Sequence, residues 1–193
     1  MPTDAPLSLA GIDTALFYAI NSGAFPFLDR FFILLSNRLL GVAVLVATLL
    51  FIFIKYRVNF VRTAFAAGLA VGLSDLFGSL VLKPFFDRVR PCYALPAETI
   101  RQLVNVSHSG SMPSLHASDA FAAAFALTFY NRRLGYVAYP IAALVAVGRV
   151  YVGVHWPFDA LAGALWGTLA GWLAVLAVNK IAGRFADRPL PPG

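Results

Sequence analysis

Residues 155–171 read HWPFDALAGALWGTLAG, and this stretch combines ionisable side chains with a regular packing pattern. His155, Asp159, Gly163, Gly167 and Gly171 recur every four residues, so in a helix they share one face. Small residues at that spacing allow two helices to approach closely in a lipid bilayer. We therefore expect a membrane helix whose glycine face is buried against a neighbour and directs Asp159 into a helical bundle.

The composition of the whole chain is typical of a membrane protein. Of its 193 residues, 60% are hydrophobic and 12% are charged, and the mean hydropathy is +0.76. Soluble domains usually carry about 25% charged residues. The net charge of +6 indicates basic cytoplasmic loops, and we expect no nucleic-acid partner. Cys92 is the single cysteine, which excludes an internal disulfide and a cysteine-based metal site.

Apolar runs of about 17–25 residues, and shorter ones with interfacial flanks, predict transmembrane helices. The predicted spans are residues 39–54, 63–82, 117–131, 134–148 and 160–179. Residues 9–36 are either an interfacial helix followed by a span or one broken span, because Asp13, Pro26 and Asp29 interrupt them. We predict an all-α bundle of about six transmembrane helices, forming one domain over residues 1–193 with a flexible tail at 184–193.

The order of these spans places three charged motifs at the same membrane surface. The motifs are KPFFDRVRP at 83–91, PSLH at 113–116 and RVYVGVHWPFD at 149–159. The opposite surface receives the larger set of basic residues, namely Lys55, Arg57, Arg62, Arg132, Arg133, Lys180, Arg184 and Arg188. Because basic loops stay in the cytoplasm, we expect a bacterial inner-membrane protein with the motifs on the extracytoplasmic side.

The three motifs contain cations that together suit a phosphate group. Lys83, Arg90 and Arg149 could clamp its oxygens, since phosphoryl transfer depends on positioning and charge stabilisation. Any one of them alone would be an ordinary interfacial anchor. Ser114 stands where an N-cap would, before an alanine-rich run, and helix N-termini bind anions through free N–H groups. The predicted phosphate-binding residues are Lys83, Arg90, Ser114, Leu115 and Arg149.

Two histidines could perform the chemistry. Asp159 can accept one ring N–H of His155, which fixes the tautomer and leaves the other nitrogen free to attack phosphorus. His116 could protonate the leaving oxygen and then activate water. The predicted catalytic group is His155, His116 and Asp159, with no metal or other cofactor. The alternative is a zinc site formed by His108, His116 and His155, which the surrounding cations oppose.

In order and spacing, the motifs K-x6-R-P, P-S-x-H and R-x5-H-x3-D resemble the signature of the type 2 phosphatidic acid phosphatase (PAP2) superfamily, over residues 63–172. The resemblance implies a metal-independent membrane lipid phosphatase that forms a phosphohistidine on His155. It implies phosphate binding by the lysine, the two arginines and the serine of the motifs. Two positions depart from the family pattern: Leu115 replaces a usual glycine, and Gly148 replaces a usual serine.

The substrate is expected to be a lipid phosphate. Residues 148–163 look like those of bacterial undecaprenyl-diphosphatases, which favours undecaprenyl diphosphate over phosphatidylglycerol phosphate, phosphatidic acid or lipid A. The expected partners are this substrate and membrane lipids, and the oligomeric state stays open. A small lipid transporter or flippase is the competing function, because Asp75 and Asp119 lie within apolar runs, where carboxylates are costly. A phosphotransferase would pass the same phosphohistidine to an alcohol instead of water.

Overall fold

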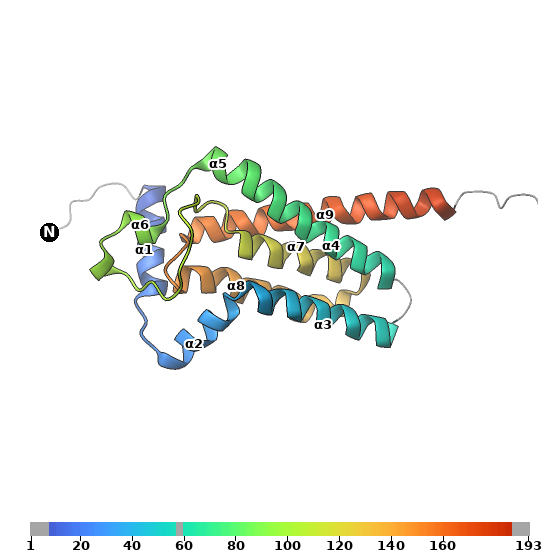
Figure 1. Cartoon of the computed structure of the whole chain (residues 1–193), viewed down its shortest axis with the longest axis horizontal. Helices are drawn as coiled ribbons and strands as arrows, with labels where there is room; N and C mark the ends of the chain where they lie inside the picture. The colour runs from blue at the N-terminus through green and yellow to red at the C-terminus, as the bar shows by residue number, and fades with distance from the viewer. Residues whose placement is uncertain (1–7, 57–59, 187–193) are drawn as a thin grey trace, which may run out of the picture.

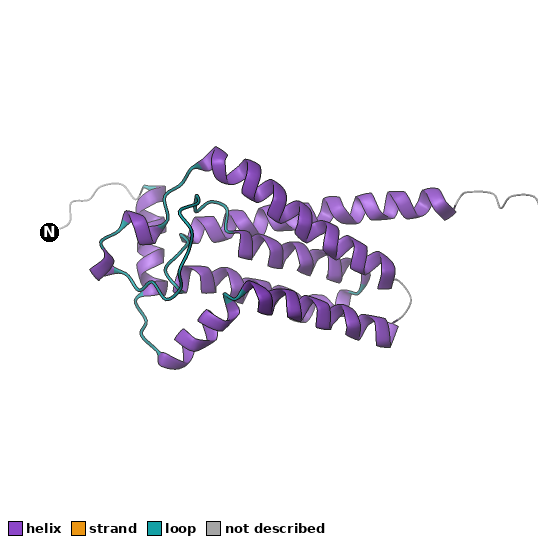
Figure 2. Cartoon of the chain, viewed as in Figure 1, coloured by secondary structure: helices purple, strands orange, loops and turns teal. Residues whose placement is uncertain are grey.

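The computed structural model describes residues 8–56 and 60–186, and the regular structure in these segments is helical throughout (Figure 1, Figure 2). In chain order the elements are α1 (Leu9–Asn21), α2 (Pro26–Leu35), α3 (Arg38–Tyr56), α4 (Phe60–Phe77), the π-helical turn η1 (Gly78–Leu82), α5 (Lys83–Phe86), α6 (Pro91–Ala94), the 3-10 turn η2 (Ala97–Thr99), α7 (Leu115–Tyr130), α8 (Arg132–Tyr151) and α9 (Pro157–Ala186). The predicted all-α fold class is confirmed.

Helix α7 is the centre of the bundle. It packs against α4, α8 and α9, which run beside it along the long axis of the molecule (Figure 1). Ala117, Ala122 and Ala126 of α7 are fully buried, so these neighbours lie close to its backbone. Helix α3 has fewer contacts and leaves Leu39 79% and Ile54 75% exposed, as expected of an apolar helix that faces lipid.

The lengths of the helices agree with a membrane bundle. In the described part of the chain, four segments are long and apolar enough to cross a bilayer: Arg38–Lys55, Phe60–Ala94, Arg132–Tyr151 and Pro157–Gly183. Helix α7 is shorter but lies among them. Residues 9–36 fold as two short helices, and the 10 residues of α2 would span only about 15 Å of a hydrocarbon core of about 30 Å. The count of six spans stays a prediction.

The C-terminal part of the predicted tail is outside the described residues, but its beginning is helical. Helix α9 continues to Ala186, so the helix includes residues 184–186. Residues 187–193 lie outside the described part of the chain.

The glycine face of α9 is pressed against the backbone of α7. A Cβ atom added to Gly167 would lie 2.0 Å from the Ser118 carbonyl oxygen, and one added to Gly163 would lie 2.4 Å from the Ser114 oxygen. Real Cβ atoms do not approach backbone so closely, so only glycine permits this contact. The prediction that this face is buried against a neighbouring helix is confirmed, and it sets the distance between Ser114 and Asp159.

We expect Gly167→Ala to destabilise the protein, because the new methyl group must push α7 away from α9. Overpacking of this kind costs about 1–3 kcal/mol, and a rigid backbone neighbour favours the upper end. Thermal unfolding in detergent measures the effect. Gly72→Ala is the matched control, since an added Cβ there meets nothing within 4 Å. Equal unfolding temperatures for the two variants would contradict the close contact.

One end of the bundle is closed by the loops and short helices. Helix α1 lies across this end, and the teal loops of Figure 2 gather beside it. The side-chain amide of Asn21 donates to the carbonyls of Arg101 and Tyr151, at 2.9 and 2.8 Å. Its oxygen accepts the backbone N–H of Arg101 at 2.9 Å. This asparagine therefore joins α1, the long α5–α7 connection and the end of α8.

Candidate active site

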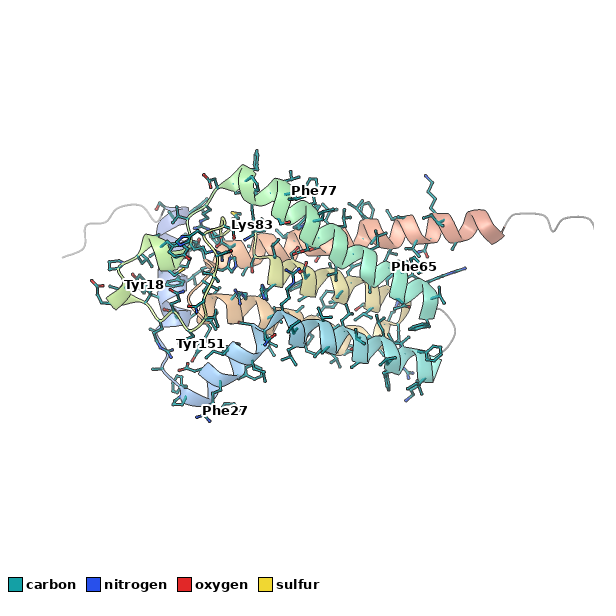
Figure 3. All side chains as sticks on the ribbon, viewed as in Figure 1. Tyr18, Phe27, Phe65, Phe77, Lys83 and Tyr151 are labelled. Atoms are coloured by element: carbon teal, nitrogen blue, oxygen red, sulfur yellow. The ribbon has the colours of Figure 1, made fainter. Side chains whose placement is uncertain are left out.

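The three sequence motifs meet at the end of the bundle that α1 covers. Figure 3 shows Lys83 and Tyr151 at this end, while Phe65 lies toward the other end. The π-helical turn η1 precedes Lys83 and widens the end of α4, a feature often found at functional sites. The predicted residues lie in or beside the ends of five elements. Lys83 follows η1, and Arg90 precedes α6. Ser114, Leu115 and His116 lie at the start of α7, Arg149 lies in the last turn of α8, and His155 and Asp159 lie around the start of α9.

The predicted phosphate-binding cations are all buried. Lys83 is 8%, Arg90 5% and Arg149 4% exposed. The Lys83 ammonium donates to the Gly110 carbonyl at 2.6 Å, and the Arg90 Nε donates to the Ser109 carbonyl at 3.0 Å. Buried cations held mainly by neutral carbonyls keep most of their charge for an anion.

Two buried polar atoms complete the set of donors. The hydroxyl of Ser114 and the Nε of Arg149 have no hydrogen-bond partner within the described segments. Ser114 is the N-cap residue of α7, but its hydroxyl does not cap the helix, so it is free to hydrogen-bond a ligand. The first N–H groups of α7 likewise have no partner inside the helix. These donors and the cations suit a phosphoryl group.

His155 is oriented by neighbours on both sides of its ring. The Nη1 atom of Arg90 donates to His155 Nε2 at 3.0 Å, and because arginine cannot accept a hydrogen bond, Nε2 carries the lone pair. The ring proton is therefore on Nδ1, which lies 3.4 Å from the Asp159 carboxylate. Such contacts are often long in free enzymes and tighten with substrate. Nε2 is the nitrogen available as a nucleophile.

The surroundings of His155 favour its neutral form. Burial, followed by the charges of Arg149 and Arg90, holds the pKa of the His155 imidazole well below its ordinary value of 6.5. Only a neutral imidazole has a lone pair for attack. The environment thus keeps the nucleophilic form at neutral and weakly acidic pH.

This depressed pKa predicts that acid destabilises the fold through His155. Below about pH 6.5 the imidazole binds a proton in the unfolded chain but not in the fold, so stability is complete above that pH and falls as the pH falls. Relative to the His155→Asn variant, the free energy of unfolding of the wild type should fall by up to roughly 1.4 kcal/mol for each pH unit of acidification. Thermal unfolding in detergent between pH 8 and 5 measures this, and a difference independent of pH would contradict it.

His116 lies in the first turn of α7, beside the same site. Its Nε2 is 3.1 Å from the carbonyl oxygen of Ser36, which can only accept, so Nε2 carries a proton. Nδ1 is then the nitrogen that can gain or lose a proton. The turn between α2 and α3, which contains Ser36, was not expected to touch the site.

A cavity of about 350 Å³ opens beside the Lys83 side chain. It is lined by Ser79, Lys83, Pro84, Asp87, Ser109, Gly110 and Leu115. These residues offer hydroxyl, carbonyl and charged groups next to an apolar wall. Such a cavity could hold the part of a headgroup that adjoins the phosphate.

The sequence comparison decides the family. Residues 60–182 match the family model of the PAP2 superfamily. The chain belongs to the PAP2 superfamily. This match confirms the resemblance drawn from the three motifs.

Relatives of known name extend over most of the chain. A lipid A 4'-phosphatase of Bacteroides thetaiotaomicron is 30% identical over 192 residues, which cover 95% of this chain and 84% of that protein. An undecaprenyl-diphosphatase of Sulfolobus acidocaldarius is 30% identical over 175 residues, covering 88% and 78%. The crystal structure of Aquifex aeolicus LpxE matches with a TM-score of 0.72 and 30% identity, covering 86% of this chain and 95% of that one.

The structure explains both departures from the usual PAP2 pattern. A Cβ on Gly78 would lie 2.6 Å from Leu115 Cδ2, so Gly78 in η1 provides the space that the larger Leu115 needs. A Cβ on Gly148 would lie 2.8 Å from Phe32 Cδ1, so Gly148 lets α2 dock against α8. A serine at 148 would collide with Phe32. Each of the two departing residues thus has a close packing partner in this structure.

The two intramembrane aspartates belong to an ion-pair cluster near α3. Arg38 Nη2 lies 2.8 Å from the Asp75 carboxylate and 4.0 Å from that of Asp119. This cluster joins α3, α4 and α7, which favours a structural role over a transport site. The remaining histidine, His108, stacks on Tyr93 with ring centroids 4.5 Å apart. Within the described residues, no three side chains of the His, Cys, Asp and Glu types come together as metal ligands.

Sequence reasoning missed two charged residues that contact the site. Arg88 Nη1 donates to Asp159 at 2.9 Å, and Arg88 Nη2 donates to Asp13 at 2.5 Å. Arg88 was noted only as part of the first motif, KPFFDRVRP, and Asp13 only as an interruption of an apolar run. The sequence held two signals for this pairing. The first motif contains an extra arginine, and the apolar N-terminal helix contains a single carboxylate, which needs a charged or polar partner.

Proposed function

We propose that this PAP2 protein is a membrane lipid phosphatase that removes phosphate from a lipid headgroup through a phosphohistidine on His155, without a metal. The observation that carries the proposal is the environment of His155. The Nε2 atom of His155, which carries the lone pair, lies 3.0 Å from Nη1 of Arg90, and a guanidinium is a group that binds phosphate. The Nδ1–H of the same ring faces Asp159. A nucleophile with an orienting carboxylate on one side and an anion-binding group on the other suits attack on phosphorus.

In the first half of the reaction the phosphate displaces Arg90 from His155. Lys83, Arg90 and Arg149 then bind the nonbridging oxygens, and the freed Nε2 attacks phosphorus. The bond between phosphorus and the leaving oxygen breaks. The negative charge of the bound phosphate stabilises a second proton on His116. His116 gives its Nδ1 proton to the leaving oxygen, because its Nε2 proton is donated to Ser36.

In the second half His116 acts as a base. Its neutral Nδ1 takes a proton from water as the water oxygen attacks phosphorus. The bond between phosphorus and His155 Nε2 breaks, which releases inorganic phosphate and restores the neutral imidazole. Asp159 stabilises the positive charge on His155 while the phosphohistidine exists.

The proposed substrate is undecaprenyl diphosphate, with lipid A as the second candidate. The first is supported by the motif around His155 and by the relative named undecaprenyl-diphosphatase. The second is supported by the relative named lipid A 4'-phosphatase, which aligns over 95% of the chain. Both lipids present a phosphate at the membrane surface, where the polar end of this bundle would lie.

We also propose an orientation in the bacterial inner membrane. The site end of the bundle would face the extracytoplasmic side, because the loops at the other end carry more basic residues. Helix α7 would be a further crossing, and α1 would lie at the interface because it runs across the end of the bundle (Figure 1). Labelling of Glu98→Cys in intact cells by a membrane-impermeant thiol reagent, in a Cys92→Ala background, would test this orientation.

Phosphate release from a panel of lipids tests the proposed function. In detergent with EDTA, we expect release from undecaprenyl diphosphate or lipid A at the rate seen without EDTA, since the protein cations neutralise the phosphate charge. A sample quenched in alkaline denaturant should contain phosphoprotein that is stable to alkali and is lost when the sample is acidified. Loss of activity with EDTA would contradict the metal-independent mechanism. Transfer of phosphate to added alcohol in preference to water would identify a phosphotransferase.

A further inference from the structure

A buried chain of charges continues outward from Asp159. Asp159 Oδ1 accepts from Arg88 Nη1 at 2.9 Å, and Arg88 Nη2 donates to Asp13 Oδ2 at 2.5 Å. The side chains of both carboxylates are 0% exposed, and that of Arg88 is 28% exposed. Two buried carboxylates thus share one guanidinium. One of them faces His155, and the other belongs to α1.

Both carboxylates also hold the first turn of α9. Asp13 Oδ1 accepts the backbone N–H of Phe158, and Asp159 Oδ2 accepts that of Trp156, each at 2.9 Å. The Arg88 guanidinium lies 5.2 Å from the centre of the Trp156 ring, a cation–π contact. These contacts fix the position of the guanidinium between the two carboxylates.

The charges of Asp159, Arg88 and Asp13 together affect how easily His155 carries a positive charge. Without Arg88, the two buried carboxylates would lose the cation that they share, and their combined negative charge would act on His155. Without Asp13, the whole positive charge of Arg88 would act on Asp159 and weaken its hold on the His155 Nδ1–H. Sharing the guanidinium therefore sets how strongly Asp159 stabilises a positive charge on His155.

We propose that Asp13 and Arg88 are positioning residues of the reaction, which keep Asp159 ionised and directed toward His155. The proposal rests on the proposed role of His155 as nucleophile. Asp13 comes from α1, which precedes the part of the chain that matches the PAP2 superfamily, residues 60–182. The helix across the end of the bundle thereby becomes part of the catalytic apparatus.

The pH profile of kcat/KM distinguishes this role from simple attachment of α1 to α9. The acid limb of that profile reports the group that must be unprotonated in the free enzyme, which is here the nucleophile His155. The charged and titratable groups that face His155 are Lys83, Arg90, Arg149, His116 and Asp159. None of these side chains is changed in the test. A shift of the acid limb therefore reports the charges of Arg88 and Asp13.

The two single variants should shift the acid limb in opposite directions. Asp13→Asn leaves Arg88 unbalanced, which disfavours protonated His155 and moves the limb to lower pH. Arg88→Gln removes a positive charge and moves the limb to higher pH, in each case by on the order of one pH unit. The double variant removes both charges, and its limb should lie near that of the wild type. Arg88→Lys keeps the charge, so it should lower kcat and leave the limb in place.

A second arginine–aspartate pair supplies the control. Arg101 Nη2 lies 2.6 Å from Asp29 and also joins the N-terminal segment to the α5–α7 connection, but it does not contact Asp159. Asp29→Asn and Arg101→Gln should leave the acid limb unchanged.

The outcomes of this test distinguish a failure of the positioning role of Asp13 and Arg88 from a failure of the proposed function. Single variants with lower kcat and an unmoved limb, or with shifts in the same direction, would show attachment only and overturn the inference. If Asp13→Asn does not fold, the comparison of Arg88→Gln with Arg88→Lys decides it. Wild-type activity that survives His155→Ala would instead overturn the proposed function itself.

Discussion

Replacement of His155 with alanine should reduce phosphate release by about 10⁴-fold or more, because it removes the atom that bonds to phosphorus. The fold should survive, since the ring packs in a polar site and contributes no large apolar surface. The cations remain, so the substrate should still bind with a similar KM. Turnover of the lipid substrate, together with the phosphoprotein trapped by an alkaline denaturing quench, measures both effects.

His108→Ala is the matched control for that variant. His108 is outside the site and stacks on Tyr93, so its loss should leave kcat within about two-fold of the wild type, as surface changes usually do. An active His155→Ala protein, or one that still forms phosphoprotein, would show that another group is the nucleophile.

The second large effect is expected for His116→Asn, and it should depend on the leaving group. With a lipid substrate, whose oxygen must be protonated to leave, kcat should fall by about 10²–10⁴-fold. With p-nitrophenyl phosphate, whose phenolate leaves unaided, formation of the phosphohistidine should be nearly unaffected. His116→Gln, whose amide nitrogen reaches the position of Nε2 and can still donate to the Ser36 carbonyl, should show the same losses.

Dephosphorylation needs the base that this variant lacks, so phosphoprotein should accumulate with p-nitrophenyl phosphate. A burst of p-nitrophenol followed by slow turnover would reveal it. Equal losses of kcat for both substrates, without accumulation, would mean that His116 only supports the packing of α7 and does not transfer the proton.

The local patterns of the sequence predicted much of this architecture. The four-residue spacing of Gly163, Gly167 and Gly171 predicted the buried face of α9, and the backbone of α7 lies against it. The order of the apolar runs predicted that the three motifs share one end of the bundle, which is where the structure places them. These features follow from helical periodicity and from the alternation of spans, and both are properties of a single segment or of chain order.

The N-terminal region was predicted least well. Residues 9–36 have an apolar composition but no clean span, because Asp13, Pro26 and Asp29 interrupt it. Their partners are distant in sequence: Asp13 pairs with Arg88, 75 residues away, and Asp29 with Arg101, 72 residues away. A buried carboxylate signals that a cation must be near, but not which one.

Sequence alone determined the membrane class, the apolar helical segments, the motif residues and the buried glycine face of α9. Each of these depends on hydrophobicity or on a period that a short stretch of chain carries. Only the tertiary structure decided that α1 lies across the site, that Arg88 bridges Asp13 and Asp159, and that Ser36 holds His116. These contacts form where irregular loops and chain ends fold over the bundle, and the geometry of such segments is set by the partners they meet, not by any repeating pattern of their own.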